Sequence, residues 1–89
     1  EQLHRKRLEF KSDIDIRGMR GEEAVQAISY FLDDAVVCNV HSLRVLHGTG
    51  NGILRTLIRQ YLSTVPFVKS FRDEHVQFGG AGITIIELE

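Results

Sequence analysis

The fold is decided by the stretch LRVLHGTGNGILR at residues 43–55, in which a glycine-rich loop joins a predicted strand to a predicted helix. Leu43–Leu46 is a short apolar run with one arginine, which is typical of a half-buried strand. His47–Gly52 has a glycine at every second position, and clustered glycines favour a loop. The segment from Ile53 to about Val65 has apolar residues at helical spacing, and the proline that follows ends the pattern. The stretch therefore predicts a strand, a loop and an amphipathic helix.

Three more strands and one more helix are predicted on either side of this stretch. Ile14–Arg17 alternates apolar and polar residues, and Glu22 to about Asn39 carries an apolar stripe at helical spacing. Val68–Arg72 alternates again, and Ile83–Leu88 is mostly apolar and β-branched. The order is βαβαββ, and strand–helix–strand units form parallel, right-handed crossovers. We therefore expect an α/β fold, an α+β two-layer sandwich with a four-stranded mixed sheet and two helices on one face.

The length of 89 residues allows one domain with one core. Residues 1–12 are charged and lack a clean period, so they are predicted to be a linker or a loosely docked arm. Residues 13–89 are predicted to form the domain. The first residue is Glu rather than Met, from which we expect a piece excised from a longer protein.

Composition excludes several classes of protein. Cys38 is the single cysteine, which excludes an internal disulfide and fits a reducing compartment. No apolar run approaches the roughly 20 residues that a membrane helix needs, and no signal-peptide pattern is present. We therefore expect a cytoplasmic protein that does not bind a membrane.

The charge is unevenly distributed, although the net charge is only −1. No Asp or Glu occurs from Ala35 to Phe71, and this segment together with Arg72 carries five of the eleven Lys and Arg residues. A local positive field can persist on a protein with a neutral total. The clustering indicates an anionic partner, and the alternative is chance clustering on a solvated surface.

The His47–Gly52 loop is the strongest functional signal. Its backbone N–H groups lie just before a helix N-terminus, where donors and the helix dipole favour an anion. Neither a Walker loop nor a dinucleotide-binding fingerprint is present, so no ATP or NAD site is expected. Arg55 and Arg59, one and two turns into the helix, are candidate phosphate contacts. The alternative is a loop that needs its glycines only for tight geometry. The candidate phosphate-binding positions in the loop are Gly48, Thr49, Gly50, Asn51 and Gly52.

Asp15, Arg17 and His47 are the candidate catalytic residues. His47 ends a strand at its carboxyl end, where a histidine can act as a general acid or base, and the alternative is a histidine that only caps the strand. If the first two strands are parallel, Arg17 ends near His47 and can stabilise charge on a reacting phosphate. Asp15 can orient either residue or bind a metal, or Asp15 and Arg17 form a structural ion pair.

The C-terminal third of the chain offers weaker candidates. Gly79–Gly82 forms either a second backbone cradle, with Gly79 and Gly80 as phosphate contacts, or a hairpin turn that glycines favour. Asp73, Glu74 and His75 are predicted to be a solvated turn. No Cys/His spacing typical of a metal site occurs, and no Ser/His/Asp nucleophile motif stands out.

These segments together resemble the Smr (small MutS-related) domain. The family's first motif, L-D-[LV]-[HR]-G, is matched by Ile14–Gly18, its central H-G-x-G-x-G-x-L-R by His47–Arg55, and its terminal G-G-x-G-[AVI]-T by Gly79–Thr84. The arginine form of the first motif is most similar to the C-terminal Smr domain of bacterial second-type MutS proteins. Thr49 stands where Lys is frequent and Asn51 where Thr is frequent, and the missing lysine removes one phosphate contact.

The resemblance implies a fold similar to the C-terminal domain of translation initiation factor three. It also implies nicking of DNA, branched structures included, by a domain of a parent ATPase that restrains recombination. Relatives act on stalled ribosomes and cleave RNA. The metal requirement stays open, with Mg²⁺ or Mn²⁺ as the ions to test. Three hypotheses follow: an endonuclease, a DNA-, RNA- or ribosome-binding module without catalysis, and a purely structural interaction domain.

Overall fold

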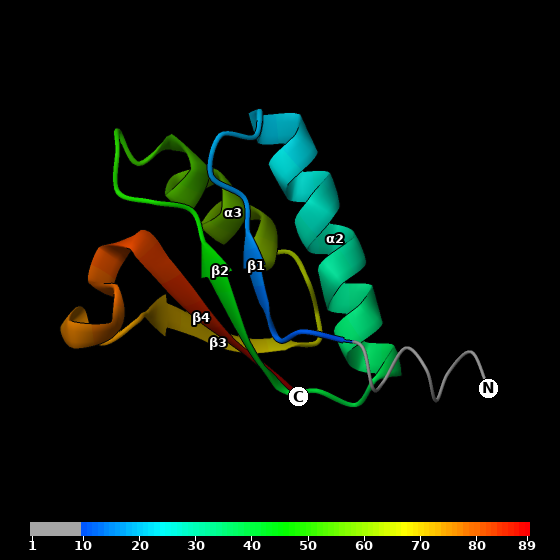
Figure 1. Cartoon of the computed structure of the whole chain (residues 1–89). Helices are drawn as coiled ribbons and strands as arrows, with labels where there is room; N and C mark the ends of the chain where they lie inside the picture. The colour runs from blue at the N-terminus through cyan, green and yellow to red at the C-terminus, as the bar shows by residue number, and fades with distance from the viewer. Residues whose placement is uncertain (1–9) are drawn as a thin grey trace.

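The computed structural model describes residues 10–89. The helices and strands follow the predicted order, with two short 3-10 turns inserted before the last strand (Figure 1). They are β1 (Asp13–Asp15), α2 (Gly21–Val37), β2 (Ser42–Leu46), α3 (Ile53–Leu62), β3 (Val68–Asp73), η1 (Val76–Phe78), η2 (Gly80–Gly82) and β4 (Ile83–Leu88).

The four strands form one mixed sheet in the order β1-β2-β4-β3. β1 and β2 are parallel, as expected for strands joined by a helix, and β4 lies antiparallel between β2 and β3. Both helices lie on one side of the sheet (Figure 1). The structure therefore confirms the predicted two-layer sandwich. The last strand of the chain occupies a central position in the sheet.

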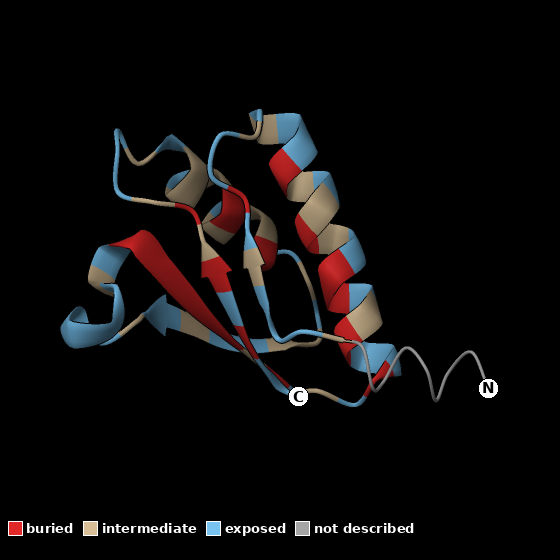
Figure 2. Cartoon of the chain, viewed as in Figure 1, coloured by how far each residue is buried: buried red, intermediate tan, exposed pale blue. Residues whose placement is uncertain are grey.

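The core lies between the helices and the sheet (Figure 2). Along β2 the side chains alternate, with Leu43 and Val45 fully buried and Ser42 and Arg44 exposed. This alternation is typical of a strand with one covered face. β4 is buried along nearly its whole length. The buried residues of α2 are Ala24, Ile28, Phe31, Leu32 and Ala35.

Helix α2 ends close to the predicted position. Asn39 has a φ of 59°, and the N–H of Val40 donates to the Ala35 carbonyl at 2.9 Å. Asparagine tolerates this left-handed conformation, which closes many helices. The predicted end near Asn39 is therefore confirmed to within two residues.

Helix α3 ends three residues earlier than the apolar stripe predicts. The Ser63 hydroxyl donates to the Arg59 carbonyl, and the Thr64 hydroxyl donates to the Tyr61 carbonyl. These side chains satisfy carbonyls at the end of the helix, and the residue before a proline disfavours the helical conformation. The chain therefore turns before Pro66, and Val65 packs against the core from the turn.

The described part of the N-terminal region begins before the predicted domain boundary at residue 13. Phe10 stacks on Phe31 of α2 with the ring centroids 5.6 Å apart, and the Ser12 carbonyl accepts the Arg44 N–H. Residues 10–12 therefore pack with the domain. Residues 1–9 of the predicted arm lie outside the described part of the chain.

Candidate nucleic-acid interface

The His47–Gly52 loop leaves the carboxyl end of β2 and enters α3, as the sequence predicts. Gly48, Gly50 and Gly52 all have positive φ, at 81°, 26° and 79°. Such backbone is strained for residues other than glycine, which explains the glycine at every second position. The loop and the turn at Gly18–Gly21 face each other across a hollow of about 310 Å³, here called the loop hollow, which Arg55 also lines.

Several donors of this loop are used within the protein. The Gly48 N–H donates to the Gly82 carbonyl at 3.0 Å, and the Gly52 N–H donates to the Thr49 carbonyl at 3.1 Å. The Asn51 side chain accepts the first helical N–H, that of Ile53, at 3.1 Å. Asparagine is a frequent residue for this capping role. The cationic side chains around the loop therefore offer more to an anion than these three amides.

Arg17 extends over the loop from the end of β1. Its Cγ and Cδ lie 3.6 Å from where a Cβ on Gly48 would stand, which is an ordinary van der Waals distance, so the Arg17 stem lies directly beside Gly48. Asp15 holds the guanidinium, accepting from Nε at 3.0 Å and from Nη2 at 2.8 Å. The hydrogen bond from Arg17 lowers the pKa of Asp15 to about 2. The pair is more than half exposed, so a solvent-borne anion can reach the guanidinium.

His47 is buried, with 6% of its surface exposed, between the loop and the sheet. Its Nδ1 lies 2.9 Å from the Gly48 carbonyl oxygen, and its Nε2 lies 2.8 Å from the hydroxyl of Thr84 on β4. Burial is the main cause that lowers the pKa of His47, and the charges of Arg59 and Arg55 act in the same direction. The ring is therefore neutral at neutral pH and bonded at both nitrogens.

Arg55 and Arg59 project from α3 toward a single carboxylate on β3. One oxygen of Asp73 accepts from Arg55 Nη2 at 2.8 Å and from Arg59 Nη2 at 2.6 Å. Arg59 Nη2 also donates to the Thr84 hydroxyl at 3.1 Å. Asp73 and Thr84 are paired in register on adjacent strands, which places both beside His47. The prediction that Asp73 and Glu74 belong to a solvated turn is wrong, since Glu74 is also bound, to Arg44.

The Gly79–Gly82 segment packs against the glycine loop as a separate turn. The Gly82 carbonyl accepts the N–H groups of both His47 and Gly48, and the Gly80 N–H donates to the His75 carbonyl. A Cβ on Gly79 would meet the Ile83 side chain, and the φ of 131° at Gly79 is strained for any other residue, so this turn favours a glycine there. These contacts fix the second turn beside the first.

Sequence reasoning missed Asp73 and Thr84 as members of the candidate site. Asp73 lies in a run of polar residues that is typical of an exposed turn, and Thr84 is one of several β-branched residues in a predicted strand. The pairing of β3 with β4 would have identified both residues, because its register places Asp73 opposite Thr84.

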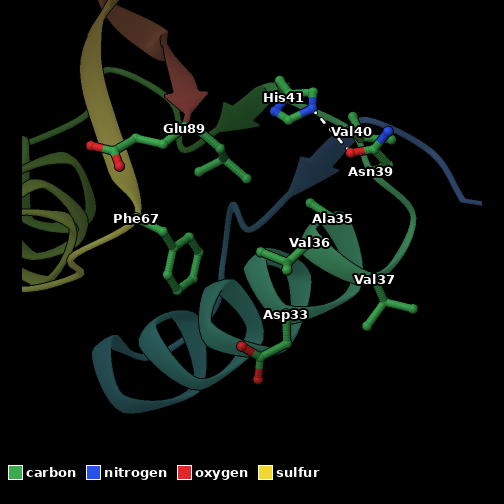
Figure 3. Close-up of a pocket in the computed structure, with 10 residues that line it drawn as sticks. Asp33, Ala35, Val36, Val37, Asn39, Val40, His41, Phe67 and Glu89 are labelled. Carbon is green, nitrogen blue, oxygen red and sulfur yellow. Dashed lines mark hydrogen bonds between the residues drawn. The ribbon is translucent and has the colours of Figure 1, made fainter.

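A second hollow, of about 480 Å³, lies beside the C-terminal end of α2 (Figure 3). Its walls come from that end of α2, including Val36 and Val37, from the turn before β2, from Phe67 just before β3 and from the last residues of the chain. Asp33 and Glu89 are the charged residues that line it. This lining is apolar and acidic, which does not suit a phosphate.

Among residues 10–89, no group of three or more His, Cys, Asp or Glu side chains is placed to hold a metal ion. None of the helices in that range is long and apolar enough to span a membrane.

The chain is similar to proteins of one family. The family model for the Smr domain matches residues 14–89. Endonuclease MutS2 of Brevibacillus brevis is 42% identical over 80 residues, covering 90% of this chain and 10% of that protein. Endonuclease MutS2 of Shouchella clausii is 39% identical over 79 residues, covering 89% and 10%. The chain therefore spans about a tenth of the length of these relatives.

Two solved structures share the fold. The Smr domain of Thermus thermophilus MutS2 superposes with a TM-score of 0.86 at 35% identity, covering 89% of this chain and 99% of that one. YdaL, a stand-alone small MutS-related protein from Escherichia coli, superposes with a TM-score of 0.83 at 18% identity, covering 88% and 64%. At that identity, the second likeness concerns the fold alone.

Proposed function

The chain belongs to the Smr domain family, and on that basis we propose that it is an endonuclease domain that breaks phosphodiester bonds in nucleic acid. The observation that carries the proposal is the convergence of three arginines on one glycine loop. Arg17 extends over Gly48, Arg55 lines the loop hollow, and Arg59 reaches His47 through Thr84. Guanidinium groups bind phosphate oxygens in pairs and stabilise charge that develops on them.

In the proposed reaction, each residue has a distinct task. Arg17 binds the scissile phosphate and neutralises its developing charge, while Asp15 holds the guanidinium in place. Arg55 and Arg59 bind the adjoining backbone after exchanging Asp73 for phosphate oxygens. His47 acts either as a general base, whose neutral imidazole takes a proton from the attacking water, or as a general acid, whose protonated imidazole gives one to the leaving oxygen. Gly48, Gly50, Gly52, Gly79 and Gly80 provide the close backbone approach, with Thr49 and Asn51 at the rim.

The substrate that we propose is DNA, duplex or branched, with RNA as the second substrate to test. We propose a MutS-like ATPase that suppresses recombination or acts on stalled ribosomes as the parent protein in cis, since the relatives are endonuclease MutS2 proteins of which the chain spans about a tenth. We also propose that the domain acts in the cytoplasm.

A second candidate function is binding without cleavage. The observation that favours it is the burial of His47, whose two nitrogens already have partners. A domain of this kind would dock its parent protein on a nucleic-acid junction or a ribosome. Its binding would weaken with salt, but it would not cut.

A nicking assay on supercoiled DNA, repeated on RNA, tests both candidates. We expect the purified chain to nick, and Arg17→Ala to reduce the rate by about 100-fold or more, the usual cost of losing a charge-stabilising donor. Arg72→Ala is the matched control, since Arg72 is exposed and pairs with Glu87 elsewhere on the sheet. Repeating the assay with a chelator, with Mg²⁺ and with Mn²⁺ decides whether cleavage requires a metal ion. Salt-dependent binding without any nicking would replace the first proposal by the second.

A further inference from the structure

The structure assigns to Thr84 the role of a positioning residue, which together with Arg59 holds His47 in one tautomer. Thr84 is fully buried on β4, so its hydroxyl cannot reach a substrate and is not a nucleophile. It contacts His47 on one side and Arg59 on the other. The consequence for cleavage rests on the proposed function, whereas the tautomer can be measured without it.

The positions of the protons follow from what each partner can donate. The Gly48 carbonyl can only accept, so the Nδ1 atom of His47, 2.9 Å away, must carry a proton. Arg59 can only donate, so the Thr84 oxygen accepts from Arg59 at 3.1 Å. The hydroxyl proton of Thr84 is then free to point at Nε2 of His47, 2.8 Å away. Each of these three hydrogen bonds has one donor and one acceptor when the ring is neutral and protonated at Nδ1.

The protonated ring fits the same surroundings less well. If Nε2 carried a proton, the Thr84 oxygen would have to accept from Nε2 as well as from Arg59. The hydroxyl proton of Thr84 would then lose Nε2 as its acceptor. The charged groups facing the ring are Arg55 and Arg59 from α3 and Asp73 from β3, and the two arginines outnumber the carboxylate. The Thr84 hydroxyl therefore stabilises the neutral form of His47.

In this arrangement, His47 also holds the glycine loop in place through a hydrogen bond. Its Nδ1–H binds the Gly48 carbonyl, while the Gly48 N–H binds the Gly82 carbonyl. The imidazole therefore links the first residue of the glycine turn to β4. Thr84 fixes the ring, and the ring fixes the peptide over which Arg17 lies.

An NMR titration of His47 in three forms of the chain tests the assignment. Thr84→Val keeps the shape and removes the hydroxyl, whereas Thr84→Ser keeps the hydroxyl. We expect the pKa of His47 to rise in Thr84→Val and to stay near the wild-type value in Thr84→Ser. Thr56→Val, at an exposed threonine on α3, is the matched control and should leave the titration unchanged. The His47 signal is identified by its loss in His47→Gln.

The outcomes separate this inference from the proposed function. If Thr84→Val leaves the pKa of His47 unchanged or lowers it, the positioning role is wrong, whatever the chain cleaves. If the pKa rises and the wild-type chain cuts no nucleic acid, the role stands and the endonuclease proposal fails. Where the chain does cut, the limb of its pH–rate profile that His47 sets should move to higher pH in Thr84→Val and not in Thr84→Ser. Should Thr84→Val fail to fold, Thr84→Cys, with a weak S–H donor, provides the test and should raise the pKa less.

Discussion

At the scale of the residue, the candidate site depends on pairs in which one side chain fixes another. Asp15 binds Arg17 through two nitrogens, and Asp73 bridges Arg55 and Arg59. A free guanidinium samples many orientations, whereas one held by a carboxylate presents its remaining N–H groups in a fixed direction. The carboxylates are therefore part of the proposed anion site, even though they repel an anion.

The depressed pKa of His47 predicts that the domain loses stability in mild acid. The folded protein resists protonation of this ring, whereas the unfolded chain takes up a proton near the ordinary value of 6.5. Unfolding therefore consumes a proton, and the free energy of unfolding falls as the pH drops below 6.5 toward the folded-state pKa. We expect the thermal midpoint to fall over this range, and to fall less steeply in His47→Gln. Parallel curves for the two proteins would contradict the prediction.

At the scale of the element, α3 and β3 are joined by the shared carboxylate of Asp73. Asp73→Asn removes the negative charge that holds the guanidinium groups of Arg55 and Arg59 together. Without it, these two positive groups repel each other. We expect a lower thermal midpoint and, because two guanidinium groups are released, tighter binding of DNA. The slope of log affinity against log salt should change little, because the same two arginines bind phosphates in the wild-type chain after leaving Asp73.

Asp33→Asn provides the control for that experiment. It changes the net charge by the same amount, but Asp33 lines the hollow at the far end of α2. It should alter the affinity little. An equal gain in affinity from both variants would mean that total charge, rather than the released arginines, governs binding.

The elements were largely predictable from local pattern, but the site that they build was not. The alternation in β2, the stripe in α3 and the glycines between them locate the loop and its arginines. The contacts of Asp73 and Thr84 depend on the antiparallel register of β3 on β4, and no local period encodes which strand lies in the middle. The early end of α3 was missed because Ser63 and Thr64 bind carbonyls, which an apolar stripe cannot reveal.

At the scale of the whole molecule, stability rests on one small core to which both helices and all four strands contribute. Leu43→Ala, at a fully buried position on β2, should cost about 2–5 kcal/mol of unfolding free energy. That is a large share of the total of about 5–15 kcal/mol that is typical of proteins. Val36→Ala, at an exposed apolar position on α2, should change stability by no more than about 0.5 kcal/mol. Denaturant midpoints measure both, and equal midpoints would contradict this account of the core.

The central position of β4 has a consequence for how the chain is made. Synthesis runs from the N-terminus, so residues 83–88 leave the ribosome after all the other strands. Until then, β2 and β3 lack the strand that pairs with both, and each presents an unpaired edge to its surroundings. The sheet therefore cannot form completely before β4 has been synthesised. Until then, the nascent domain is prone to aggregation.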